Sequence, residues 1–293
     1  MPPAATHAAD RLLAAIERLG APVCVGLDPV LEKIPSAVRS ASISPVDAIE
    51  KFSRGVIDAI AATVPCVKPQ SACFERHGSA GVAALERTIA HAKARGLEVI
   101  LDAKRGDIGV SAEHYAEAAF GCADSVGADW ITINSYLGDD GMRPFLRPGR
   151  GAFALVRTSN PGGDALQSQR LADGTTVADA VARLVAGIGE SSIGARGFSS
   201  LGAVVGATKR DDTARLRALM PRQVFLVPGY GAQGARLEDV LPCFHPDGRG
   251  AIVTASRAVI YAAPDATEWT AAVRSAAEKL CAQLRAGLGL GAR

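Results

Sequence analysis

The chain has 293 residues, of which 48% are hydrophobic, so it can bury the core of one large α/β domain. Its formal net charge of +2 argues against a general electrostatic attraction to nucleic acid or to an anionic membrane, although local basic residues can still bind a phosphate. It contains no apolar run of about 18 residues, so no membrane-spanning helix is expected.

The start of the chain and its cysteines favour a cytoplasmic protein. Residues 1–7 lack a basic segment followed by an apolar one, so we expect no signal peptide. The six cysteines show neither CxxC pairing nor zinc-ligand spacing. Cys24, Cys66 and Cys122 lie in or beside apolar runs, which predicts small buried side chains. Reduced thiols are typical of the cytoplasm.

Eight short apolar runs predict β-strands, at residues 22–27, 65–69, 97–102, 129–133, 151–156, 202–206, 223–227 and 250–254. Stretches with helical spacing of apolar residues lie between most of them, at 46–62, 81–95, 110–122, 176–188, 211–220 and 264–284. A further helix is predicted over residues 6–19, ahead of the first strand. Strands that alternate with helices in this way favour a parallel sheet.

Eight strand–helix repeats in a chain of this length predict a single-domain (β/α)8 TIM barrel with an extra N-terminal helix. We expect one domain over residues 1–293, with its core at about 22–284. The alternative is a doubly wound open sheet, which would usually show fewer strands and a dominant glycine-rich turn after the first one. Here the first strand runs into Gly26-Leu27-Asp28-Pro29, without GxGxxG.

Two connections are long, at residues 157–175 after the fifth strand and 228–248 after the seventh. Long loops in a compact domain are usually functional, and the loops that follow the strands of such a barrel line its active-site face. The candidate functional residues are therefore those at the C-terminal ends of the predicted strands.

The segment 101–109, Leu-Asp-Ala-Lys-Arg-Gly-Asp-Ile-Gly, says most about chemistry. Asp102 and Lys104 lie two residues apart at the end of a strand, so their side chains should share a face. Asp107 follows in the turn, between glycines that let the backbone approach a ligand. Burying such charges is costly unless they are paired. A structural ion pair is the alternative interpretation of an isolated Asp-x-Lys.

Other strand ends add polar side chains. The first strand ends near Asp28, and the fifth is followed by Thr158 and Ser159. Lys68 ends the second strand and, taken alone, is more typical of a lysine that reaches solvent. With the charged residues of the 101–109 segment it forms an alternating Lys-Asp-Lys-Asp array, which would present a fixed electric field to a substrate.

The last two strand ends have the features of a phosphate site. Gly229, Gly231 and Gly234 follow the seventh strand and permit backbone N–H groups to face an anion. Arg257 follows the eighth strand, and arginine suits bidentate phosphate binding. Barrels of this class often bind phosphate with these two loops. Tyr230 is either a phosphate ligand or a residue that packs the loop.

These segments together resemble the orotidine 5'-phosphate decarboxylase family, in particular its bacterial type 2 subgroup. The resemblance runs from about residue 22 to 262 and rests on the segments 25–28 (VGLD), 67–70 (VKPQ), 102–109 (DAKRGDIG), 228–229 (PG) and 256–257 (SR). It implies a carboxy-lyase that converts orotidine 5'-phosphate to UMP and carbon dioxide, the last step of de novo pyrimidine biosynthesis, with no metal and no other cofactor.

The resemblance also implies the catalytic roles. Lys104 would protonate C6 of the pyrimidine, and Asp102 would lie against the departing carboxylate. Lys68 would bind the ribose hydroxyls and hold Asp102 in place. Asp107 would complete the tetrad, and in the family it enters from the neighbouring subunit of a dimer. We therefore expect a homodimer with active sites at the subunit interface, and neither nucleic acid nor a membrane as a partner.

The remaining positions are implied to bind substrate. Asp28 would contact a ribose hydroxyl, and Ser159, with Thr158, the edge of the pyrimidine. The residues implied at the 5'-phosphate are Gln233 and Arg257, with Gly231 and Gly234 shaping the loop.

Two other functions compete with this one. A sugar-phosphate decarboxylase or aldolase on the same barrel also carries Asp-x-Lys-x-x-Asp, but it holds a magnesium ion and should show an extra acidic ligand after the first or second strand. Here the second strand ends in Lys68, a poor neighbour for a divalent cation. The histidines, including His114, have no metal-ligand spacing. A catalytically silent phosphate-binding barrel is the other alternative, and the intact charged residues argue against it.

Overall fold

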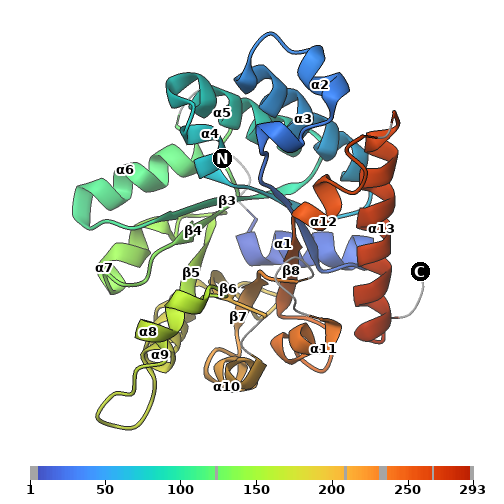
Figure 1. The fold of residues 1–293 in the computed structure, drawn as a ribbon. Helices are drawn as coiled ribbons and strands as arrows, with labels where there is room; N and C mark the ends of the chain where they lie inside the picture. Colours follow the sequence, from blue (N-terminus) through green and yellow to red (C-terminus); the bar gives the residue numbers. More distant parts are fainter. Residues whose placement is uncertain (1–5, 123–124, 208–209, 231–235, 266, 291–293) are drawn as a thin grey trace.

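The computed structural model describes residues 6–122, 125–207, 210–230, 236–265 and 267–290. Its eight parallel strands pair in chain order and close into a barrel (Figure 1), which confirms the predicted TIM barrel over the open sheet. The strands are β1 (Val23–Leu27), β2 (Cys66–Pro69), β3 (Glu98–Arg105), β4 (Trp130–Ile133), β5 (Gly151–Arg157), β6 (Ser199–Val205), β7 (Gln223–Val227) and β8 (Ala251–Ala255).

Helices surround the strands (Figure 1). They are α1 (Ala8–Leu19), α2 (Ser36–Ser40), α3 (Pro45–Ile60), α4 (Ser71–Glu75), α5 (Gly78–Ala94), α6 (Gly109–Phe120), α7 (Asp139–Met142), α8 (Asp164–Gln167), α9 (Val177–Gly189), α10 (Arg210–Leu219), α11 (Leu237–Val240), α12 (Arg257–Ile260) and α13 (Trp269–Gly287). None of the helices in the described ranges is long and apolar enough to cross a membrane.

The predicted helices correspond to α1, α3, α5, α6, α9, α10 and α13, with one notable difference. The helix predicted to start at residue 264 begins at Trp269, because the chain forms turns and bends between α12 and α13. The β4–β5 connection, where no long helix was predicted, contains the single-turn helix α7.

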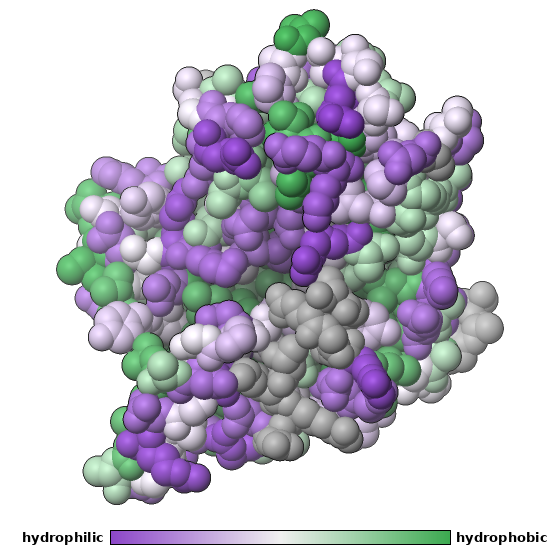
Figure 2. Space-filling model, viewed as in Figure 1, coloured by the Kyte–Doolittle hydropathy of each residue, from purple (hydrophilic) through white to green (hydrophobic). Residues whose placement is uncertain are grey.

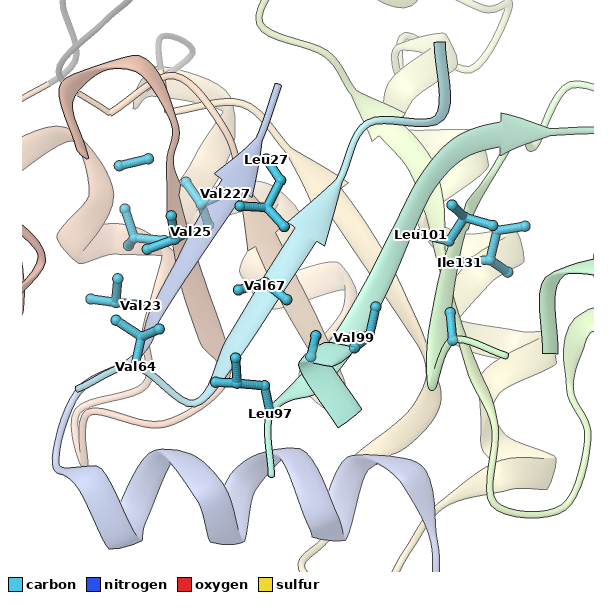
Figure 3. Close-up of a cluster of buried hydrophobic side chains, with 14 of the residues drawn as sticks. Val23, Val25, Leu27, Val64, Val67, Leu97, Val99, Leu101, Ile131 and Val227 are labelled. Atoms are coloured by element: carbon cyan, nitrogen blue, oxygen red, sulfur yellow. The ribbon is translucent and has the colours of Figure 1, made fainter. Parts of the chain in front are cut away.

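Strand side chains alternate between two packed layers. Val23, Val25 and Leu27 belong to the larger apolar cluster between the barrel and its helices (Figure 3), whereas Cys24 belongs to the cluster inside the barrel. Trp130 is also in the interior cluster. Both faces of each strand are thus buried, as expected for a parallel sheet covered by helices.

The helix α1 closes the N-terminal end of the barrel; it is the helix below the strands in Figure 3. Its apolar residues Leu12 and Leu13 pack into the interior cluster. On its polar side, Arg11 bonds Glu98 Oε1 at 3.0 Å and Asp129 Oδ1 at 3.1 Å, both at the starts of strands. The predicted extra helix thus forms the floor beneath the barrel interior.

The cysteines are all free thiols. Cys24 and Cys66 are in register on adjacent strands inside the barrel, and burial, followed by the neighbouring Cys24, raises the pKa of Cys66. Cys122 is exposed, so the expectation that it is buried was wrong. It lies just past the end of α6, where its amide donates to Ser125 Oγ at 3.1 Å.

Candidate active site

A cavity of about 490 Å³ opens where the strands end. Hydrophilic residues gather around the centre of this face of the molecule in Figure 2. The predicted site residues that line the cavity are Asp28, Lys68, Asp102, Lys104, Thr158, Ser159 and Arg257. The structure therefore brings together residues from five widely separated segments of the chain.

Asp102 is the centre of the charged group. Lys68 Nζ donates to its Oδ2, and Lys104 Nζ donates to its Oδ1 at 2.6 Å. Thr132 Oγ1 also donates to Oδ1, at 2.9 Å, and Gln70 Nε2 donates to Oδ2 at 3.2 Å. Both carboxylate oxygens are thus fully engaged. Gln70 and Thr132 were not among the predicted site residues; Gln70 was visible only as part of the VKPQ segment.

The ion pairs decide the charge of each group. Burial favours the neutral form of Asp102, but Lys68 and Lys104 outweigh it and hold the pKa of this carboxyl well below its usual range. Burial likewise opposes the charge of Lys68, but Asp102 and then Asp28 outweigh it and raise the pKa of Lys68 to about 12. The pair is therefore charged at neutral pH. The Lys104 side chain is 48% exposed, which leaves it accessible from the cavity.

The backbone at Lys104 is unusual. Its φ of 48° makes it the one non-glycine residue with positive φ in the described part of the chain, a conformation that L-residues rarely adopt. It lies where the β3–β4 register shifts between Leu101 and Arg105. The Lys104 amide donates to Thr132 Oγ1 at 3.0 Å. The two-residue alternation that predicted a shared face thus breaks here, although Asp102 and Lys104 both line the cavity. Strain of this kind persists where surrounding contacts enforce it.

Three buried polar atoms beside the charged group have no hydrogen-bond partner among the described residues: Asp28 Oδ1, Thr254 Oγ1 and Ser256 Oγ. All three residues line the cavity, on the adjacent strands β1 and β8 or just after them. Gly26 makes room for this arrangement, since a Cβ there would lie 2.9 Å from Ser256 Cβ. Buried polar groups without a partner are costly, so these atoms suit a polar ligand. Thr254 and Ser256 were not assigned to the site from sequence.

The predicted phosphate residues that the structure describes also line the cavity. Arg257 begins α12 directly after β8, and Gly229 follows β7 with a φ of 105° that favours glycine. Tyr230 also lines the cavity; burial, followed by the nearby Glu238, raises its pKa. The predicted residues Gly231, Gln233 and Gly234 lie outside the described residues.

Asp107 does not line the cavity of its own chain. It is half-buried, and its Oδ1 accepts a hydrogen bond of 2.8 Å from the Ile108 amide. A single chain therefore does not assemble the predicted Lys-Asp-Lys-Asp array. Several large hydrophobic residues are exposed on the segments near it in sequence and on the β4–α7 loop, namely Ile108, Val110, Tyr115, Tyr136 and Leu137. His114, one of the histidines without metal-ligand spacing, is exposed on α6.

Comparison with known proteins places this barrel among nucleotide decarboxylases. The family model described as "Orotidine 5'-phosphate decarboxylase / HUMPS family" matches residues 21–272. The orotidine 5'-phosphate decarboxylase of Rhodopirellula baltica is 42% identical over 298 residues, covering 94% of this chain and 98% of that protein. The protein of the same name from Deinococcus radiodurans is 41% identical over 244 residues, covering 82% and 84%.

Solved structures of proteins with the same name have the same fold as this chain. The structure of Leishmania donovani OMP decarboxylase superposes with a TM-score of 0.79 at 32% identity, covering 98% of this chain and 100% of that one. Leishmania donovani UMP synthase gives a TM-score of 0.81 at 34% identity, covering 98% of this chain and 58% of that longer one. A family match over most of the chain, with the same barrel and close relatives across its length, confirms the resemblance: the chain belongs to the orotidine 5'-phosphate decarboxylase family.

Proposed function

We propose that this protein is a carboxy-lyase that converts orotidine 5'-phosphate to UMP and carbon dioxide, with Lys104 as the proton donor to C6. The observation that carries the proposal is the ion pair of Lys104 and Asp102 in the cavity, buttressed by Lys68. The relatives that match most of the chain carry the name of this enzyme, which catalyses the last step of UMP biosynthesis.

The charges suit this reaction. When the C6–carboxylate bond breaks, its electron pair stays on C6, where no carbonyl is positioned to delocalise it. The Lys104 ammonium can stabilise this negative charge and then transfer its proton to C6, regaining one from solvent afterwards. An ionised Asp102 would face the substrate carboxylate and repel it, and this repulsion would end as carbon dioxide departs. Lys68 would keep Asp102 charged and contact the ribose hydroxyls.

The rest of the cavity suits the rest of the nucleotide. Arg257 would bind the 5'-phosphate together with Gln233, on a loop shaped by Gly231 and Gly234. The unpartnered Asp28 Oδ1 would accept from a ribose hydroxyl. Thr158 and Ser159, after β5, would lie along the pyrimidine edge. Phosphate binding far from C6 supplies energy that can orient the ring above Lys104.

Asp107 requires a second subunit in this proposal. Because it lies outside the cavity of its own chain, it would complete the site of a neighbouring copy in a homodimer. The exposed hydrophobic residues near it, Ile108, Val110 and Tyr136 among them, suit burial in such an interface. The free cysteines and the biosynthetic role suit a cytoplasmic enzyme.

A sugar-phosphate enzyme that depends on magnesium is the rival within the same family of barrels. Both oxygens of Asp102 already accept hydrogen bonds, two of them from ammonium groups. A divalent cation at this carboxylate would face the positive charges of Lys68 and Lys104 at short range, which is strongly unfavourable. The donor set therefore favours an organic anion over a metal ion as the ligand.

The test is the ultraviolet absorbance of orotidine 5'-phosphate incubated with the purified protein and excess EDTA. A spectral change to that of UMP supports the proposal. Activity on a sugar phosphate that requires magnesium, with no change in orotidine 5'-phosphate, would transfer the protein to the rival reaction. Tight UMP binding without turnover of either substrate would instead make it a binding protein.

A further inference from the structure

The connection between β5 and α9 folds back onto its own beginning. The Thr158 amide donates to Gln167 Oε1 at 2.9 Å, and Gln167 Nε2 donates to Thr158 Oγ1 at 2.8 Å. These two bonds close residues 158–167 into a loop. Thr158, Ser159 and Asn160, at the start of this loop, line the cavity, whereas Gln167 does not.

Arg157, the last residue of β5, holds the same loop through its side chain. Its side chain is 4% exposed and forms ion pairs with Asp164 at 2.6 Å and with Asp212 of α10 at 2.8 Å. It also donates to Gln167 Oε1 at 3.2 Å and to Ser168 Oγ at 3.0 Å. A buried arginine with this many partners fixes the path of the chain on both sides of the loop. Gln167 is the partner that connects this anchor to Thr158.

Two glycines show how closely the loop is packed. A Cβ at Gly163 would lie 2.7 Å from Thr158 Oγ1 and 3.2 Å from Gln167 Oε1. The φ of Gly163 is −62°, which any residue adopts, so the requirement for glycine is one of space. On the other side, a Cβ at Gly206 would lie 2.8 Å from the Ser159 backbone nitrogen. The start of the loop therefore has little freedom to shift.

We infer that Gln167 is a positioning residue for recognition of the pyrimidine base, acting through Thr158 and its neighbours Ser159 and Asn160 without contacting the substrate. The inference rests on the proposed function, in which these cavity residues lie along the base. A loop whose contact residues are already held in place loses less conformational entropy on binding. Gln167 should therefore matter for the base and not for the phosphate, which in the proposed function is bound by Arg257 on another strand end.

The variants have matched controls in the same loop. Gln167→Met keeps the length of the side chain and removes both bonds to Thr158. Its control is Gln169→Met, because Gln169 is exposed and its side chain bonds only locally, to the Ala165 carbonyl at 3.1 Å. Gly163→Ala places a Cβ against both Thr158 and Gln167. Its control is Gly162→Ala, because a Cβ there has no neighbouring atom closer than 3.7 Å. Gln167→Glu is the conservative variant, since a carboxylate can accept from the Thr158 amide and hydroxyl and from Arg157.

The measurement is the Kd of each variant for UMP and for ribose 5-phosphate, which lacks the base. For Gln167→Met and Gly163→Ala we expect the Kd for UMP to rise about 10-fold, the effect of losing one or two hydrogen bonds. The Kd for ribose 5-phosphate should change by less than about 2-fold. Both controls and Gln167→Glu should resemble the wild type. Equal weakening of both ligands, or no weakening by Gln167→Met, would overturn the inference.

Hydrogen exchange separates this inference from the proposed function. In the ligand-free protein, the amides of residues 158–160 should exchange faster in Gln167→Met than in Gln169→Met. Suppose that Gln167→Met weakens UMP binding as expected, but the wild type leaves orotidine 5'-phosphate unchanged. The decarboxylase proposal is then refuted, and the positioning role of Gln167 is not. Suppose instead that the wild type turns over orotidine 5'-phosphate, but Gln167→Met has the same hydrogen exchange and the same Kd for UMP as the wild type. The positioning role is then refuted, and the decarboxylase proposal is not.

Discussion

The Thr132 hydroxyl connects the backbone of Lys104 to the side chain of Asp102. It accepts from the Lys104 amide at 3.0 Å and donates to Asp102 Oδ1 at 2.9 Å. One buried hydroxyl on β4 thus fixes both the strained backbone that carries the proposed proton donor and the orientation of the carboxylate beside it. A threonine hydroxyl can fill both roles because it is a donor and an acceptor at once.

Thr132→Val should lower kcat about 10-fold or more, because it leaves the Lys104 amide without its acceptor and frees the positive-φ backbone to relax. Thr132→Ser, which keeps the hydroxyl, should retain most of the activity. Steady-state kinetics on orotidine 5'-phosphate check this expectation. A valine variant with the kcat of the wild type would show that Thr132 does not position Lys104.

Lys104→Ala should reduce kcat by several orders of magnitude while UMP still binds, because Lys68 remains to neutralise Asp102 in the cavity. Single-turnover absorbance and UMP titration give the two quantities. Near-normal turnover would remove Lys104 from the reaction. Loss of UMP binding together with turnover would give Lys104 a role in ligand binding.

Mixing two inactive variants tests the shared site. Lys104→Ala and Asp107→Asn should each be nearly inactive, but a hybrid dimer would contain one site with both residues intact. After exchange of subunits, we expect about a quarter of the wild-type activity. The measurement is activity before and after co-refolding of the two variants. If the mixture stays inactive although hybrid dimers are demonstrated, Asp107 does not act across the interface.

The ion pair of Lys68 and Asp102 should give stability with a defined pH range. The depressed pKa of Asp102 stabilises the fold above the pKa of an unfolded aspartate, near 4, and this contribution disappears as the pH falls through the native pKa. The raised pKa of Lys68 stabilises the fold below about 10.5, and this contribution disappears as the pH rises through about 12. Between about pH 5 and pH 10 the contribution should be constant.

Asp102→Asn should therefore lower the free energy of unfolding at pH 7 by about 3 kcal/mol, because Lys68 remains buried without its counter-ion. In acid the difference from the wild type should narrow. Urea unfolding at pH 7 and pH 3 measures both values, with Asp140→Asn, at an exposed position on α7, as the control. If Asp102→Asn lowers the free energy of unfolding equally at pH 7 and pH 3, the assignment of an ionised Asp102 with a lowered pKa is contradicted.

Arg217 should be essential for stability and irrelevant to chemistry. Its buried guanidinium donates to the carbonyls of Cys243, Met220, Gln223 and Gly250, at 2.8–3.1 Å, and lies 3.5 Å from the centre of the Phe225 ring. Arg217→Met should lower the free energy of unfolding by about 3 kcal/mol or more, because several carbonyls lose their donors.

Arg217→Lys should recover only part of this loss, since an ammonium has three donors and cannot reproduce the planar fork of arginine. Chemical denaturation checks both variants. In the fraction that remains folded, kcat per active site should equal that of the wild type. A changed kcat in fully folded Arg217→Met would show that this residue also influences the site.

The sequence predicted those parts of the fold that depend on local pattern. Apolar runs such as 22–27 identified the strands because both faces of a parallel strand are buried. The exposure of Cys122 was missed because the apolar run in the sequence continues past Phe120, where α6 ends. Helix starts such as that of α13 depend on the preceding turn, which periodicity does not register.

For the site, the sequence identified the charged residues but not the hydrogen bonds and backbone conformation that position them. Asp102 and Lys104 were evident from their spacing, whereas the positive φ of Lys104 and its bond to Thr132 arise from a register shift between two strands. Gln167 lies nine residues from Thr158, and their contact appears only when the loop folds back. Asp107 follows the same charged motif in sequence but lies outside the cavity of its own chain, which its spacing does not reveal.

Because α1 closes one end of the barrel, it restricts how substrate enters the cavity and how products leave it. With Leu12 and Leu13 packed into the interior and Arg11 bonded across the strand starts, molecules exchange with solvent through the opposite mouth. Orotidine 5'-phosphate, UMP and carbon dioxide would share this one route. Bound UMP would then obstruct the next substrate, so product inhibition should be purely competitive.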